Sequence, residues 1–184
     1  MSLPLPGRKE IHAEVADMLG RHLANVYTLM LRLQNFHWNV EGATFYSAHN
    51  LFEQKYEELW GEVDEIAERI RIVGATPPAT LKEFFELSQI ADRPQPTDCD
   101  AMYNELITCY VICREFCQET LKTAGLVGDE VTCDLLISHL AKFEKAIWMF
   151  RSSLSRTEPL HASEQTREQP VKLSHIDTLH PEFN

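Results

Sequence analysis

Histidine and carboxylate side chains that could bind a metal ion recur between residues 37 and 68. His49 and Glu53 are four residues apart, and so are Asp64 and Glu68. In a helix this spacing places each pair on one face. Imidazole and carboxylate ligands without thiolate suit Fe(II), Mn(II) or Zn(II), and carboxylates can rearrange as iron passes from Fe(II) to Fe(III). Acidic residues beside an apolar helix face are also commonly solvated, so residue types and spacing leave both interpretations open.

Helix length decides how these groups could meet. His49 and Asp64 are fifteen residues apart, which is about 22 Å along a helix, so one site within one chain cannot use both. A second copy of the helix, antiparallel across a two-fold axis near Leu59, brings the two pairs together and creates two identical sites. His37 closes the preceding helical segment and can reach His49 across a hairpin. Each predicted site takes His37, His49 and Glu53 from one subunit and Asp64 and Glu68 from the other.

Four long segments with helical periodicity carry these residues. They span about 9–39, 45–73, 98–124 and 129–154, and Gly and Pro cluster between them. In the second segment apolar residues recur at three- and four-residue steps, including Phe52, Tyr56 and Leu59. Gly74 ends that segment, Thr80 with Glu83 predicts a capping box for a short helix, and Asp129 is a predicted N-cap. The pattern predicts an all-α, ferritin-like four-helix bundle with a short helix in the long second crossover.

The composition narrows the class of protein. The chain has 184 residues and a net charge of −11, which argues against a large surface for nucleic acid. No apolar run reaches membrane-spanning length, and the first residues lack the apolar region of a signal peptide. The five cysteines form no disulfide framework, so we expect a reducing cytoplasm. Residues 1–156 are the predicted bundle, and residues 157–184 are a polar tail.

The residues around the candidate ligands resemble the Dps family of mini-ferritins over about residues 9–155. The similarity includes two histidines twelve residues apart, the acidic pair of the second helical segment and the motifs of the fourth helical segment. These are Phe36-His37-Trp38-Asn39-Val40-Glu41-Gly42, then Phe45, His49 and Phe52-Glu53, Asp64-Glu65-Ile66-Ala67-Glu68-Arg69, Gly128-Asp129-Glu130-Val131-Thr132-Cys133-Asp134-Leu135-Leu136, Phe143-Glu144-Lys145 and Trp148-Met149.

The resemblance implies a dodecameric shell with tetrahedral (23) symmetry. Such shells oxidise Fe(II), usually with hydrogen peroxide, bind two ions at each intersubunit ferroxidase site and store ferric mineral, which protects the cell and its DNA from oxidative stress. The family's ligands map onto the five residues that the two-fold argument selects. The position of Glu53 is often Asp in this family, and the extra methylene could shift the metal. Trp38 lies beside His37, and two roles are possible for it: quenching of radicals and packing at the subunit interface.

The resemblance also implies acidic pores at the three-fold axes, through which cations pass. Asp134 is the best pore candidate, with Glu130 and Asp129 nearby. Helix capping and a favourable helix dipole are the alternative role for these acidic residues.

Other functions remain to be weighed. A nucleoid-type DNA-binding shell with residual iron binding needs basic tails, but the termini offer few Lys or Arg residues, so weak or absent DNA binding is predicted. A structural or signalling bundle leaves the clustered ligands unexplained. A Glu-x-x-His pair typical of bundle-internal di-iron sites occurs only at Glu158 and His161, in the tail. Cys109, Cys113 and Cys117 could bind a soft metal, but a place in the apolar core is favoured.

Overall fold

The computed structural model describes residues 8–155, and their side chains from residue 13. It contains five helices and, within that range, no strand. They are α1 (Arg8–Asn39), α2 (Phe45–Ile72), α3 (Leu81–Leu87), α4 (Cys99–Leu126) and α5 (Glu130–Ser153). The predicted all-α bundle is confirmed, with boundaries within a few residues of those expected. The predicted tail, residues 157–184, lies outside the described residues, and so do its Glu158 and His161.

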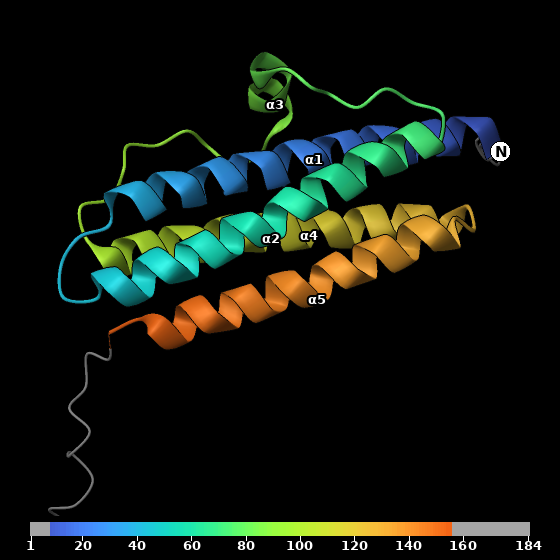
Figure 1. Ribbon diagram of the computed structural model, residues 1–184. Coiled ribbons are helices and arrows are strands. Elements are labelled where there is room, and N and C mark those ends of the chain that lie inside the picture. Colours follow the sequence, from blue (N-terminus) through green and yellow to red (C-terminus); the bar gives the residue numbers. More distant parts are fainter. Residues whose placement is uncertain (1–7, 156–184) are drawn as a thin grey trace, which may run out of the picture. The chain divides into compact units, whose positions relative to one another are not determined.

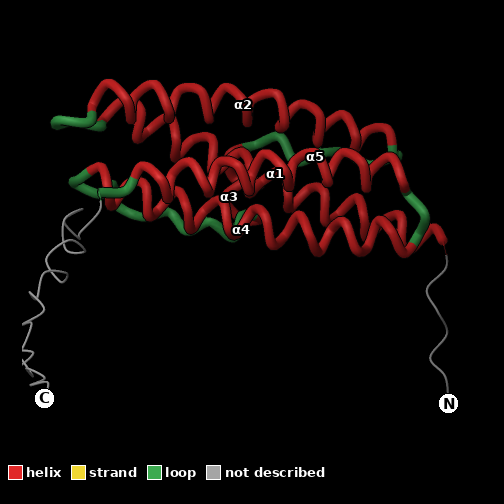
Figure 2. The backbone as a smooth tube through the Cα atoms, turned by 90° about the horizontal axis from the view of Figure 1, so that it is seen from below, coloured by secondary structure: helices red, strands yellow, loops and turns green. Residues whose placement is uncertain are grey.

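The four long helices run along one common direction, with loops at their ends (Figures 1 and 2). Helix α1 runs antiparallel to both α2 and α4, and it packs against each of them. The crossover from α2 to α4 returns along the length of the bundle and carries α3 against α1 (Figure 1). This is the ferritin-like topology that the long second crossover predicted.

Local signals set the helix ends. The Thr80 hydroxyl accepts from the Glu83 amide while the Glu83 carboxylate accepts from the Thr80 amide, which completes the predicted capping box. The Asp98 carboxylate caps α4 in the same way by accepting from the Ala101 amide. Gly74 follows α2 with a φ of +93°, a conformation that favours glycine and stops the helix.

The bundle interior is mostly apolar and includes the cysteine stripe of α4. Cys109, Cys113 and Cys117 are all buried and unbonded to other cysteines. Desolvation raises the pKa of the Cys109 thiol to about 11 and that of Cys117 to about 12. Thiols held protonated in this way are poor metal ligands, which agrees with the core role favoured from the sequence. No helix in residues 8–155 is long and apolar enough to cross a membrane.

A pair of buried histidines interrupts the apolar core. His22 of α1 and His139 of α5 are fully buried, and their ring centroids are 6.0 Å apart. The Nε2 atom of His139 lies 3.2 Å from a carboxylate oxygen of Glu65, whereas neither ring nitrogen of His22 has a hydrogen-bond partner among the described residues. Desolvation, with a smaller contribution from His139, lowers the pKa of His22 to about 3. Both rings are therefore neutral in the folded protein near pH 7.

Helix α2 also turns a carboxylate into the core. Glu62 is 1% exposed, and its Oε1 atom lies 3.5 Å from the Lys142 ammonium of α5. That separation allows an ion pair, but neither Glu62 oxygen has a hydrogen-bond partner within the described range. Desolvation raises the pKa of Glu62 to about 7, although Lys142 opposes the shift. Ionised Glu62 therefore destabilises the fold at alkaline pH.

Replacing Glu62 by glutamine is expected to stabilise the protein at pH 8 and to change little at pH 4. The folded-state pKa is raised, so the folded protein binds this proton more tightly than the unfolded chain. Stability is then lost as pH rises from about 4.5 to about 7. Glu62→Gln removes that loss, which is worth up to about 3 kcal/mol at 1.36 kcal/mol per pKa unit.

Thermal unfolding of Glu62→Gln at both pH values measures this effect. Glu119→Gln, on the exposed surface of α4, is the matched control and should leave the midpoint unchanged at either pH. A lower midpoint for Glu62→Gln at pH 8 would show instead that ionised Glu62 and Lys142 stabilise the fold as a pair.

Candidate metal centre

Two histidines meet where α1 ends and α2 begins. The Nδ1 atom of His37 lies 3.0 Å from the carbonyl oxygen of His49, and Nδ1 of His49 lies 2.8 Å from that of His37. The rings stack with centroids 3.8 Å apart. A carbonyl oxygen only accepts, so each Nδ1 carries the proton and donates. Each Nε2 is then left with a lone pair, which is the arrangement that prepares imidazole for metal binding.

The chain between the helices fixes this histidine pair. Gly42, with a φ of +98°, lies in the tight turn that joins the two helices. The Phe45 amide donates to the Gly42 carbonyl, and the Phe45 ring stacks on His49 at 5.0 Å. Just inside, the buried rings of Phe36 and Phe52 are 6.2 Å apart and anchor α1 to α2. His37 is 8% exposed. The histidine pair therefore packs against a buried part of the core.

Glu53 lies one turn after His49 on α2 and is half-buried. The Tyr56 hydroxyl is 3.5 Å from Glu53 Oε1, and the Tyr56 ring meets His37 edge-on at 5.3 Å. Desolvation, with the Glu53 and Glu57 carboxylates adding, raises the pKa of Tyr56, so the phenol is a hydrogen-bond donor. The sequence placed Tyr56 on the apolar face of its helix, and its contact with Glu53 was not predicted.

The other two candidate ligands lie further along α2. Asp64 and Glu68 are exposed. In the described part of a single subunit, no three His, Cys, Asp or Glu side chains converge to hold a metal ion. The structure thus brings His37 and His49 together where α1 meets α2. Glu53 lies one turn further along α2, and the acidic pair lies further along the same helix. Trp38, next to His37, is 70% exposed on the subunit surface.

The three pore candidates differ in their surroundings. The Asp129 carboxylate caps α5 by accepting from the Thr132 amide, and it pairs with Arg69 of α2 at 2.6 Å. Glu130 and Asp134 are exposed on the first turns of α5. Asp129 therefore has the capping role that was the alternative for these residues, while Glu130 and Asp134 are available to solvent.

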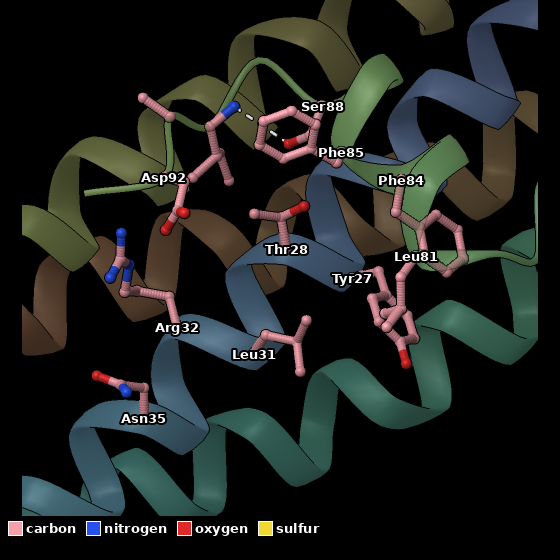
Figure 3. A pocket seen from close by; sticks show the side chains of 12 residues that line it. Tyr27, Thr28, Leu31, Arg32, Asn35, Leu81, Phe84, Phe85, Ser88 and Asp92 are labelled. Carbon is pink, nitrogen blue, oxygen red and sulfur yellow. Dashed lines mark hydrogen bonds between the residues drawn. The ribbon is translucent and has the colours of Figure 1, made fainter. Parts of the chain in front are cut away.

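A surface pocket of about 310 Å³ lies between α1 and α3 (Figure 3). Tyr27 and Leu31 of α1 face Leu81 and Phe84 of α3 across it, and the Tyr27 and Phe84 rings stack at 4.3 Å. Its lining is largely apolar and includes none of the candidate metal ligands. The predicted metal site therefore lies apart from this pocket.

A ferritin-like bundle with a stacked histidine pair at the α1–α2 turn defines the class of protein. The family model of the ferritin-like domain matches residues 16–159. DNA protection during starvation protein 2 of Bacillus anthracis is 33% identical over 146 residues, covering 79% of this chain and all of the relative. The family is therefore established by sequence as well as by fold.

Solved structures agree with this assignment. The Dps protein of Bacillus brevis superposes with a TM-score of 0.75 at 33% identity, covering 78% of this chain and 96% of that one. The Dps protein of Staphylococcus aureus gives a TM-score of 0.75 at 35% identity, with coverage of 78% and 97%. A Dps protein from Vibrio cholerae, described as a ferritin-like diiron-carboxylate protein, gives 0.75 at 28% identity, with coverage of 78% and 90%. The chain belongs to the Dps family of ferritin-like proteins.

Proposed function

We propose that this protein is a ferroxidase that oxidises Fe(II) with hydrogen peroxide and stores the ferric product in a hollow shell. Family membership supports iron storage and protection from oxidative stress in general. In the proposed reaction two Fe(II) ions each give one electron to one peroxide molecule. The O–O bond breaks, and two protons complete two water molecules, so no hydroxyl radical is released.

The observation that carries this proposal is the mutual orientation of His37 and His49. Each ring donates from Nδ1 to the other residue's carbonyl and keeps Nε2 for a ligand. With Glu53 they offer two nitrogens and a carboxylate, a donor set that suits Fe(II) and also Zn(II) or Mn(II). Asp64 and Glu68 of the partner subunit complete the proposed site for two iron ions.

The proposed site needs a two-fold dimer, and we propose that such dimers assemble into a dodecamer with 23 symmetry. Exposed apolar side chains beside the α1–α3 pocket, among them Leu31, Leu81 and Phe85, support a surface that another subunit covers. Exposed Trp38 and Trp60 support the same inference for the faces of α1 and α2. We place the shell in the cytoplasm, where its free cysteines remain reduced.

Anaerobic addition of Fe(II) followed by hydrogen peroxide tests the function. Ferric absorbance and particle mass are followed together, with buffer as the control. Oxidation faster than buffer, by a particle of dodecameric mass, is expected. A dodecamer that oxidises Fe(II) no faster than buffer would leave a cage without ferroxidase activity.

Removing the exposed carboxylate of Asp134 is expected to slow iron loading without abolishing oxidation. We propose that Asp134 and Glu130 attract cations to the three-fold pores. Asp134→Asn should lower the initial loading rate about two- to tenfold at low ionic strength and less at high salt, because salt screens attraction between exposed charges and ions. Stopped-flow loading at two salt concentrations measures this. Glu144→Gln, exposed further along α5, is the control, and equal rates for both variants would exclude a pore role.

Direct binding to DNA is expected to be weak or absent. The net charge of −11 repels phosphate, and protection of DNA then follows from removal of iron and peroxide. A gel-shift at neutral pH and moderate salt should show no retardation at submicromolar protein. Retardation at that concentration would favour the alternative of a DNA-binding shell.

A further inference from the structure

Tyr56 contacts two of the proposed ligands at the same time. Its hydroxyl is 3.5 Å from Glu53 Oε1 and its ring meets His37 edge-on at 5.3 Å. The tyrosine lies on α2 one turn after Glu53, so a helix that is fixed by its buried face also fixes the phenol. The hydroxyl can therefore direct the Glu53 carboxylate without any movement of the backbone.

Glu53 needs such direction more than the histidines do. The two imidazole rings are stacked and each is held by a backbone carbonyl, whereas Glu53 is a half-buried side chain with three rotatable bonds. A side chain that must be ordered when metal binds lowers the affinity, and a prior contact that restricts it recovers part of that loss.

We propose that Tyr56 is a positioning residue of the ferroxidase site: its hydroxyl restricts the Glu53 carboxylate and so lowers the cost of ordering that ligand when Fe(II) binds. The inference rests on the proposed function and deepens it. It also gives a reason for Glu at position 53. An aspartate would withdraw the carboxylate by about 1.5 Å, one carbon–carbon bond, from a hydroxyl that is already at the limit of hydrogen bonding.

Tyr56→Phe removes the hydroxyl and keeps the ring against His37. Fe(II) is titrated anaerobically, hydrogen peroxide is added, and the rate of ferric absorbance is fitted for KM and kcat. We expect KM for Fe(II) to rise roughly tenfold, the lower end for loss of a residue that orients a metal ligand. The kcat should change by less than about twofold, because the ligands themselves remain. Tyr27→Phe, which removes a hydroxyl from a half-buried ring in the α1–α3 pocket, should match the wild type.

The Glu53→Asp background separates positioning from packing. It keeps a carboxylate ligand but moves it out of reach of the phenol, so Tyr56→Phe should have no further effect there. An equal loss in both backgrounds, or an unchanged KM for Tyr56→Phe in the native background, would overturn the positioning role while the wild-type rate still supports the ferroxidase. A wild type no faster than buffer would overturn both.

Discussion

Mixed shells of His37→Ala and Asp64→Ala subunits are expected to regain about a quarter of the wild-type ferroxidase activity, although each variant alone is inactive. If every site takes His37 from one subunit and Asp64 from the other, a two-fold dimer of the two variants holds one site that lacks both ligands. Its other site keeps all five. Random co-assembly makes about half of the dimers mixed, so about a quarter of all sites are intact.

This result would establish that each site is shared between two subunits. Within a subunit His37 and His49 stack and Glu53 lies one turn later on α2, while Asp64 is exposed further along the same helix. The two variants are refolded or co-expressed together, and ferric absorbance after peroxide is measured at equal dodecamer concentration. Should the mixed shells be no more active than either parent, Asp64 would not complement a site in the neighbouring subunit.

A second mixture provides the control. His37 and His49 lie on the same side of the proposed site, so a dimer of His37→Ala and His49→Ala leaves one ligand missing from each site. No activity should return. Recovery in this mixture would show that His37 and His49 come from different subunits or are not both required, and it would contradict the proposed division of ligands.

The elements and the histidine pair could be predicted because their signals are local. A capping box at Thr80, an N-cap at Asp129 and a stop at Gly74 each act within one turn of helix, and all three are present in the structure. The proximity of His37 and His49 follows from a short turn between antiparallel helices. Their exchange of hydrogen bonds with each other's carbonyl could not be predicted, because it depends on the backbone path through residues 40–44.

The polar residues of the core show where residue type misleads. Lys55 and Glu62 are buried on α2, and both continue the three- and four-residue steps of Leu59 and Ile66. An assignment of the buried face by apolar residue type alone includes Tyr56, which is only half-buried in the structure. The helical period alone places Glu62 inside, whereas the cost of burying a carboxylate favours the surface. Its ion pair with Lys142 reaches across to another helix and has no signature in the sequence.

Asp129→Ala is expected to cost roughly 3–5 kcal/mol of stability, the magnitude for breaking a largely buried ion pair. Arg69 donates to Asp129 at 2.6 Å and to the Thr132 hydroxyl at 2.7 Å, which ties α2 to α5. Desolvation raises the pKa of Asp129. Hydrogen bonds from Thr132 and the charge of Arg69 outweigh desolvation and hold this pKa below its usual range. The ionised carboxylate is thus the form that the folded state favours, and its removal leaves the guanidinium without a counter-charge.

Asp98→Ala is the control that separates the two contributions of Asp129 to stability, the ion pair and the helix cap. Asp98 caps α4 through the Ala101 amide but is exposed, so its loss should cost only about 1 kcal/mol. Asp129→Ser keeps a capping oxygen and removes the charge, and it should fall near Asp129→Ala if the pair with Arg69 dominates. Urea unfolding of all three at one protein concentration decides this, because oligomer stability depends on concentration. Equal losses for Asp98→Ala and Asp129→Ala would mean that the link between α2 and α5 adds nothing beyond a cap.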